Sequence, residues 1–259
     1  MDLHLLNRNS NIYFDQNDDF ELTKSQRKKL RKTRQKNLVR NNLELEEITP
    51  KTKKQVDAFT SYYEGDHLVL HGVAGTGKTF IAMFLALSDI SRNIEDKTNL
   101  FIIRSAVPSR NIGFLPGNIK EKAKIYELPY QEICSELYNR KDAYELLKQK
   151  GTVDFMTTSF FRGLTLRNAI VIVDEIQNLT SAEFSTIMTR IGENCRLIVC
   201  GDIKQTDLDR REKIEVKNNL EILKRMKSTR FIEFDYDDIC RSDFVKDFLI
   251  TKDRYESML

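Results

Sequence analysis

Three glycines at fixed spacing come just before a lysine and a threonine in one short stretch of the sequence. Glycine lacks a Cβ, so its backbone can adopt positive φ and turn its N–H groups toward a bound anion. Lys78 would place a positive charge on the β and γ phosphates, and the Thr79 hydroxyl is the expected Mg²⁺ ligand. The spacing G-x-x-x-x-G-K-[ST] predicts a loop that binds a nucleoside triphosphate, and its residues are Gly72, Val73, Ala74, Gly75, Thr76, Gly77, Lys78 and Thr79.

Two acidic residues follow an apolar run further along the chain. The run Ala169-Ile170-Val171-Ile172-Val173 ends in Asp174 and Glu175. A buried parallel strand here would deliver Asp174 to the metal, which it would hold directly or through water, while Glu175 would take the proton from the attacking water. Many strands end in acids, so this run gains its meaning from the phosphate loop upstream.

A third apolar run ends in a Gly-Asp turn and is followed by Gln205. The turn would bring Gln205 to the same crevice, where its amide could contact the γ phosphate and the attacking water. Gln205 is therefore a candidate sensor of hydrolysis. The alternative is a turn amide that caps the next helix.

The elements that must position these residues alternate between strands and helices. We expect strands at 68–70, 100–103, 153–156, 170–173, 197–200 and 231–234, and helices at 80–90, 128–150 (as one or two pieces), 182–191 and 213–226. This alternation predicts parallel βαβ units in a doubly wound α/β sheet, with ligands at the carboxyl ends of the strands.

One segment near the N-terminus carries all the excess positive charge. It holds nine basic residues and no acid, and since the formal net charge of the chain is +3, the rest of the chain is at −6. The segment is either a solvated arm or an arm that neutralises nucleic-acid phosphates. Its basic residues are Lys24, Arg27, Lys28, Lys29, Arg31, Lys32, Arg34, Lys36 and Arg40.

The sequence shows neither a membrane-spanning segment nor a signal peptide. No apolar run approaches the roughly 20 residues of a membrane span, and the first twenty residues contain no signal-peptide core. The sequence therefore predicts a cytoplasmic protein that does not enter a membrane.

Several ordered blocks together resemble the PhoH family of P-loop ATPases, which is related to the core domain of superfamily one helicases. Beside the phosphate loop, seven further blocks carry the resemblance. They are Thr52-Lys53-Lys54-Gln55, Gly113-Phe114-Leu115-Pro116-Gly117-Asn118 followed by Glu121-Lys122, Phe161-Arg162-Gly163-Leu164-Thr165-Leu166, Asp174-Glu175-Ile176-Gln177-Asn178, Thr189-Arg190-Ile191-Gly192, Gly201-Asp202-Ile203-Lys204-Gln205-Thr206-Asp207-Leu208 and Asp238-Ile239-Cys240-Arg241-Ser242-Asp243-Phe244-Val245. The chain departs from the family at Ile176, where an alanine is common, and at Ser242-Asp243, where His-Pro is usual.

The resemblance implies a three-layer, RecA-like P-loop NTPase with a mainly parallel sheet over residues 46–259, after a short basic N-terminal extension over residues 1–45. It implies that Gln55 reads the adenine edge of ATP. It also implies that Arg190 or Arg241 stabilises charge in the transition state, although an arginine near a strand end is more often a surface ion pair.

The same resemblance implies an Mg²⁺-dependent ATPase that binds single-stranded RNA or DNA, with RNA favoured. The expected contacts are the basic arm and the loop near Arg104 and Arg110. Related helicases place ATP between two core domains, so a chain with one core domain predicts a homo-oligomer, such as a hexameric ring, in which the arginine acts across an interface. The alternatives are a nucleotide-gated RNA- or protein-binding module without translocation, and a nuclease or an accessory factor of RNA degradation.

Overall fold

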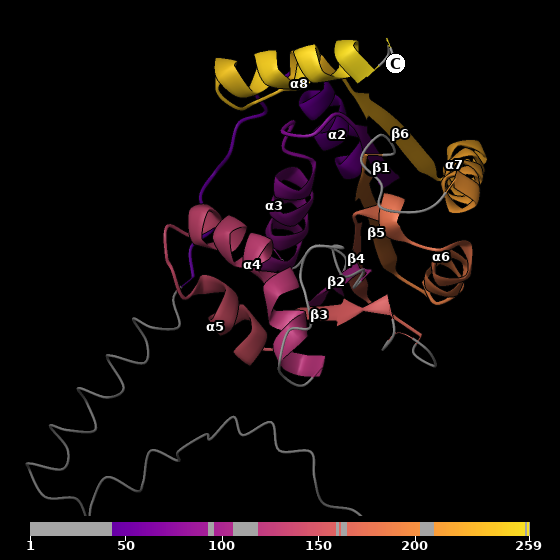
Figure 1. Ribbon diagram of the computed structural model, residues 1–259. Coiled ribbons are helices and arrows are strands. Elements are labelled where there is room, and N and C mark those ends of the chain that lie inside the picture. The colour runs from indigo at the N-terminus through magenta and orange to yellow at the C-terminus, as the bar shows by residue number, and fades with distance from the viewer. Residues whose placement is uncertain are drawn as a thin grey trace, which may run out of the picture. The chain divides into compact units, whose positions relative to one another are not determined.

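A computed structural model of the chain describes residues 43–92, 96–105, 119–158, 161, 165–202, 210–256 and 258. Glu44–Leu259 form one compact unit, and Met1–Leu43 are a separate unit. The basic segment at 24–40 lies outside the described residues. The compact unit is built around a six-stranded sheet with the strand order β3-β2-β4-β5-β1-β6 (Figure 1).

Every neighbouring pair of strands in this sheet is parallel. The central strand β4 is buried along its whole length, as expected for a parallel strand covered on both faces. The six strands appear where they were expected, so the prediction of a mainly parallel sheet is confirmed. Their bounds are β1 (His67–Gly72), β2 (Asn99–Arg104), β3 (Val153–Thr157), β4 (Ala169–Asp174), β5 (Cys195–Gly201) and β6 (Thr229–Phe234).

Helices cover both faces of the sheet, which confirms the predicted three-layer α/β fold. One face is covered by α2 (Lys53–Tyr63), α3 (Lys78–Ser91), α4 (Ile119–Leu137) and α5 (Ala143–Gln149), and the other by α6 (Ser181–Met188) and α7 (Arg210–Arg225) (Figure 1). Helix α3 contacts β2, β4 and β5, and α7 contacts β6. None of the helices in the described part is both long and apolar enough to span a membrane.

The helices differ from the sequence expectation in three places. The stretch 128–150 is divided between two helices, which was one of the expected alternatives, but the first of them, α4, already begins at Ile119 and contains Pro129. Helix α2 was not expected; it begins after Thr52, whose side chain accepts a hydrogen bond from the backbone N–H of Gln55. Helix α8 (Asp243–Glu256) was not expected either, and none of its residues is buried.

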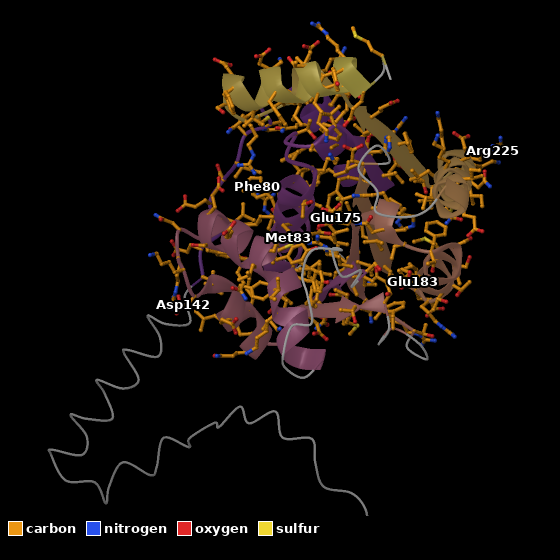
Figure 2. The ribbon with its side chains drawn as sticks, viewed as in Figure 1. Phe80, Met83, Asp142, Glu175, Glu183 and Arg225 are labelled. Carbon is orange, nitrogen blue, oxygen red and sulfur yellow. The ribbon has the colours of Figure 1, made fainter. Side chains whose placement is uncertain are left out.

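The carboxyl ends of the strands meet at one edge of the sheet, and strand register decides which residues are neighbours there. Arg104 at the end of β2 is directly paired with Asp174 at the end of β4. After β6 the chain returns to the same edge, since the backbone N–H of Cys240 donates to the carbonyl of Gly75 at 3.0 Å. With side chains drawn, Glu175 lies between α3, which carries Phe80 and Met83, and α6, which carries Glu183 (Figure 2).

Candidate active site

The predicted phosphate loop connects β1 to α3. The backbone φ angles of Gly72, Gly75 and Gly77 are 124°, 79° and 80°. Residues other than glycine rarely adopt φ angles in this region. Gly77 is the N-cap of α3 and no side chain caps this helix. The N–H groups of its first turn therefore face the loop, where an anion could accept their hydrogen bonds.

Lys78 is held inside this loop by backbone carbonyls. Its Nζ donates to the carbonyl oxygens of Gly72 at 2.8 Å and Val73 at 2.7 Å. Thr76 adds a hydrogen bond from its hydroxyl to the carbonyl of Val73, at 3.0 Å. Burial lowers the pKa of the Lys78 ammonium from its usual value. The ammonium is thus fixed at the centre of the loop, where β and γ phosphates would bind.

Thr79 and Asp174 come together although they are far apart in the sequence. The Thr79 hydroxyl donates to Asp174 Oδ1 at 3.1 Å, and Asp174 Oδ2 accepts from the hydroxyl of Tyr130 at 2.8 Å. Burial raises the pKa of Asp174 and the neighbouring Glu175 adds to this, whereas the hydrogen bonds from Tyr130 and Thr79 act in the opposite direction.

This corner fits the magnesium ion that the fold implies. Its donors, a hydroxyl and a carboxylate, are hard oxygen ligands of the type that Mg²⁺ prefers. Among the described residues, no group of three or more His, Cys, Asp and Glu side chains could hold a metal ion. Such an ion would need ligands beyond the protein, as when Mg²⁺ is bound through one or two protein oxygens together with water and substrate phosphates.

Glu175 has an unusual backbone conformation, with φ 54° and ψ 47°. A non-glycine residue in this left-handed region costs about 1–2 kcal/mol, so the surrounding structure must hold it there. Gln177 donates to the Glu175 carboxylate through its Nε2, and its Oε1 accepts from the backbone N–H of Asp202 at 3.0 Å. Gln177 therefore links the end of β4 to the end of β5.

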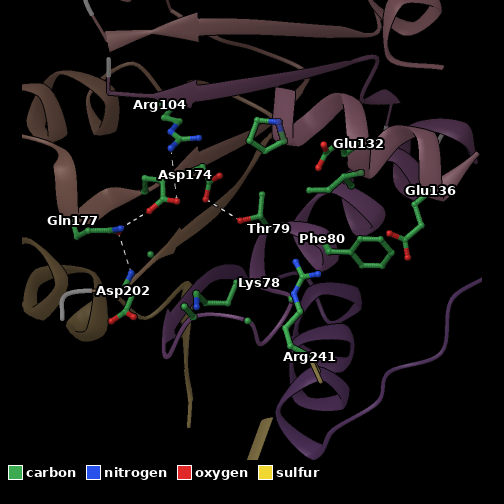
Figure 3. A pocket seen from close by; sticks show the side chains of 17 residues that line it. Lys78, Thr79, Phe80, Arg104, Glu132, Glu136, Asp174, Gln177, Asp202 and Arg241 are labelled. Carbon is green, nitrogen blue, oxygen red and sulfur yellow. Dashed lines mark hydrogen bonds and ion pairs between the residues drawn. The ribbon is translucent and has the colours of Figure 1, made fainter. Parts of the chain in front are cut away.

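A cavity of about 460 Å³ joins the phosphate loop to these acids (Figure 3). A second cavity, of about 500 Å³, lies beside it, and the two share Gly75, Gly77, Phe80, Glu136 and Arg241 in their linings. A nucleotide could thus place its phosphates in the first cavity and its base in the second. The second cavity is also lined by Ile48, Pro50, Gln55, Phe59 and Cys240.

Gln55 lies between the second cavity and the phosphate loop. Its Nε2 donates to the carbonyl of Thr76 at 3.1 Å and to Cys240 Sγ at 3.3 Å, while its Oε1 accepts from the backbone N–H of Lys51 at 2.7 Å. A purine in this cavity would compete with Cys240 for one donor of Gln55. The other donor is directed at the loop itself.

The structure separates the two candidate arginines. Arg241 lines both cavities of its own chain, so the expectation that it acts from another copy of the chain is corrected, because the segment after β6 returns to Gly75. Arg190 follows α6 and its carbonyl accepts from Leu166, which precedes β4. Arg190 therefore lies at the amino end of the strands, the opposite edge of the sheet from Glu175. Its Nε is buried with no hydrogen-bond partner in the described part of the chain.

Two further predicted residues, Gln205 and Arg110, lie outside the described residues. The expectation for Arg104 is wrong in one respect, since Arg104 is the last residue of β2 rather than part of a loop. Its guanidinium lies 3.9 Å from the Glu175 carboxylate and packs over the Tyr126 ring. It faces the candidate active site.

Sequence reasoning did not assign roles to Tyr130, Gln177 or Arg104 at this site. Gln177 follows the two acids directly, so its position offered a signal. Tyr130 offered none, because it is separated from Asp174 by 44 residues and meets it only through the packing of α4 against the sheet.

Comparison with known proteins gives one family. Residues 47–252 match the family named PhoH, described as "PhoH-like protein". A PhoH-like protein of Synechocystis is 32% identical over 81% of this chain, and this chain covers 63% of that protein. A PhoH-like protein of Bacillus subtilis is 30% identical over 83% of this chain and is covered to 67%. Among solved structures, the Pyrococcus furiosus Hef helicase domain is similar at 14% identity over 73% of this chain and 40% of that chain, with a TM-score of 0.44.

Proposed function

This chain belongs to the PhoH family, and from that membership and the geometry of the pocket we propose that it is an Mg²⁺-dependent ATPase acting on single-stranded nucleic acid. The observation that carries the proposal is the convergence of Lys78, Thr79, Asp174 and Glu175 on one cavity. Lys78 and Thr79 begin α3, while Asp174 ends β4 and Glu175 follows it directly. Together they supply the parts that phosphoryl transfer to water requires.

The proposed division of labour follows from their positions. Lys78 and the N–H groups at the start of α3 would bind the phosphates. Thr79 and Asp174 would hold the metal ion, which would supply positive charge to the phosphate oxygens. Glu175 takes a proton from the water that attacks the γ phosphorus, and the bond to the β-phosphate oxygen breaks to give ADP and phosphate. Gln177 and Arg104 keep the Glu175 carboxylate oriented toward that water. Gln205 would sense the γ phosphate.

The preference for ATP over GTP rests on Gln55 and the family resemblance. In the structure Gln55 borders the cavity in which the base would lie, and its amide can both donate and accept. An adenine edge presents one donor and one acceptor to such an amide.

Nucleic-acid binding is supported by the distribution of charge. The nine basic residues at 24–40 leave the rest of the chain with a formal charge of −6. Attraction to a phosphate backbone is therefore concentrated in that segment, with little choice of sequence. Arg104 is no longer proposed as a nucleic-acid contact, because it faces Glu175. Arg110 remains a proposed nucleic-acid contact. RNA is favoured over DNA through the family resemblance alone.

A homo-oligomer, such as a ring, remains part of the proposal because Arg190 lies at the opposite edge of the sheet from the pocket. A head-to-tail interface would bring that edge of one copy to the pocket of the next. Mixing Lys78→Ala chains with Arg190→Ala chains tests this, because a mixed interface pairs an intact pocket with an intact arginine. Recovery of hydrolysis on mixing is expected. Two inactive variants that stay inactive when mixed, while light scattering shows mixed oligomers, would exclude a role for Arg190 in trans.

The decisive experiment for the whole proposal is the steady-state ATPase rate with no nucleic acid, with single-stranded RNA and with single-stranded DNA. We expect hydrolysis that requires Mg²⁺, rises with a single strand and rises more with RNA. Absence of hydrolysis in all three conditions would refute the ATPase. Binding of the strand without stimulation or unwinding of a tailed duplex would instead identify a nucleotide-gated binding module.

A further inference from the structure

Helix α4 places a tyrosine hydroxyl in the corner formed by Thr79 and Asp174. Tyr130 is fully buried, and its hydroxyl donates to Asp174 Oδ2 at 2.8 Å. A buried hydroxyl needs a hydrogen-bond partner, and the ring is fixed beside Phe155, with 5.7 Å between ring centroids. The direction of this donor is thus set by packing.

We propose that Tyr130 is a positioning residue, which holds the carboxylate of Asp174 so that the oxygen shared with Thr79 faces the metal. This inference rests on the proposed function, because it assumes that Asp174 is a metal ligand. Tyr130 itself touches neither metal nor substrate in this role. It acts through Asp174.

The geometry of the carboxylate supports this role. Asp174 Oδ1 accepts from Thr79 and Oδ2 accepts from Tyr130, so the carboxylate is held at both ends and cannot rotate about its own axis. Each carboxylate oxygen can accept more than one hydrogen bond or ligand, so the contact with Thr79 leaves Oδ1 able to serve a metal or a metal-bound water. Outer contacts of this type commonly orient metal ligands in proteins.

Arg104 holds the adjacent acid in a similar manner. It is paired in register with Asp174 on the neighbouring strand, and its guanidinium lies 3.9 Å from the Glu175 carboxylate. Although burial opposes the effect, Tyr130, Glu175 and Asp174 raise the pKa of Arg104. Tyr130 and Arg104 are therefore neighbours, each directed at one of the two acids.

The position of Tyr130 on α4 distinguishes it from a residue that only fills the core. The same helix lines the nucleotide cavity through Pro129, Glu132, Ile133 and Glu136 (Figure 3). Pro129 lines the cavity, and the next residue of the helix, Tyr130, donates to Asp174. One helix thus contacts both the cavity and the metal ligand.

The test compares Tyr130→Phe with Tyr144→Phe in the full chain. The two tyrosines are matched, because Tyr144 is also buried and donates to a carboxylate, that of Glu127, at 2.8 Å. They differ in the acid that they hold, since Asp174 lines the cavity and Glu127 does not. Mn²⁺ is the probe, and its binding in the presence of ADP is measured by electron paramagnetic resonance. Binding of ATP without metal is measured calorimetrically in EDTA.

We expect Tyr130→Phe to weaken Mn²⁺ binding by about tenfold, the lower end for loss of an outer contact, with metal-free ATP binding unchanged. Tyr144→Phe should alter neither. Equal Mn²⁺ affinities in the two variants would overturn the proposal, and so would an equal loss of metal-free ATP binding in Tyr130→Phe. The Mn²⁺ measurement needs no turnover, so absence of hydrolysis in the unaltered protein would refute the ATPase separately.

A second variant covers the case in which Tyr130→Phe does not fold. Placing 3-fluorotyrosine at position 130 keeps the ring and the hydroxyl but alters the strength of the donor. Mn²⁺ affinity should then change at position 130, whereas the same replacement at position 144 should have no effect. An unchanged affinity at position 130 counts against the proposal.

Discussion

Gln55 Nε2 donates a hydrogen bond to the carbonyl oxygen of Thr76, 3.1 Å away, and so ties α2 to the phosphate loop. The same amide accepts from the backbone of Lys51 and borders the second cavity. Gln55, to which the family resemblance assigns base recognition, therefore also stabilises the phosphate loop. The two roles can be separated by experiment.

Gln55→Ala should weaken binding of both ATP and tripolyphosphate, by about threefold to tenfold, the effect of one or two lost hydrogen bonds. Tripolyphosphate carries no base, so its binding reports on the loop alone. Calorimetry with both ligands makes the comparison. Normal tripolyphosphate binding beside weakened ATP binding would leave Gln55 as a base reader only.

Lys78→Ala and Glu175→Gln should separate binding from chemistry. Loss of the Lys78 ammonium removes charge-assisted hydrogen bonds to the phosphates, so nucleotide affinity should fall by about tenfold or more. Glu175→Gln keeps the shape of the side chain but removes the base, so ATP should stay bound while hydrolysis slows by about 10²- to 10⁴-fold. Nucleotide binding and phosphate release are measured in parallel, and a similar loss of affinity in both variants would contradict the role of Glu175.

Gly72→Ala should destabilise the fold far more than Gly65→Ala. Both glycines have positive φ, of 124° and 105°, so both substitutions introduce backbone strain of about 1–2 kcal/mol. A Cβ at Gly72 would also lie 2.0 Å from the carbonyl oxygen of Phe234, whereas one at Gly65 would meet nothing within 4 Å. We expect a loss above about 4 kcal/mol for Gly72→Ala in urea unfolding. Similar losses at both positions would show that β1 and β6 are not packed so closely.

The basic arm should control the salt dependence of single-strand binding. A variant with Arg31→Gln, Lys32→Gln and Arg34→Gln removes three charges, and if all three contact phosphates the slope of log affinity against log salt should become shallower by about 2. The matched control carries Lys217→Gln, Arg225→Gln and Lys227→Gln, three exposed positions of the compact unit, and changes the net charge equally. Identical slopes in the two variants would assign the arm to solubility.

Protonation of His71 should make the fold less stable as the pH falls below about 6.5, which is the ordinary pKa of a histidine side chain. Burial lowers the pKa of His71, against the opposing effect of Asp202 and Glu233, so the unfolded chain binds a proton at a pH where the folded chain does not. Stability is then lost with falling pH. His71→Phe keeps the packing on Phe231 and removes ring nitrogens that have no partner in the described part. Urea unfolding at pH 7.5 and 5.5 should show a smaller loss in the variant.

The sheet and the phosphate loop could be predicted because their signals are local. Each strand is a short run of apolar residues, and β4 is apolar from Ala169 to Val173 because both of its faces are buried. Helix α8 carries apolar residues at helical spacing, among them Phe244, Phe248 and Tyr255, and the sequence prediction overlooked this signal. None of its residues is buried in the described structure. Helix α2 is marked in the sequence mainly by its cap at Thr52, and the resemblance of that stretch to a binding motif does not by itself indicate a helix.

The outer contacts of the site could not be predicted, because they depend on tertiary packing. Strand register places Arg104 beside Asp174, and no feature near Arg104 in the sequence indicates which strand will be its neighbour. Gln177 reaches the backbone of Asp202 because residue 201 is glycine: a Cβ there would lie 2.6 Å from Gln177 Oε1. Arg190 was predicted as one of two alternatives, and only the topology of the sheet showed that it lies far from the pocket of its own chain.

The pairing of β6 with β1 bears on the order of events during synthesis. The wall of the nucleotide pocket that contains Cys240 and Arg241 follows β6, and β6 is the last strand to leave the ribosome, although it pairs with the first. A nascent chain that already displays the phosphate loop and both acids still lacks this wall. Under the proposed function, the full nucleotide pocket therefore forms only after Cys240 and Arg241 have been translated.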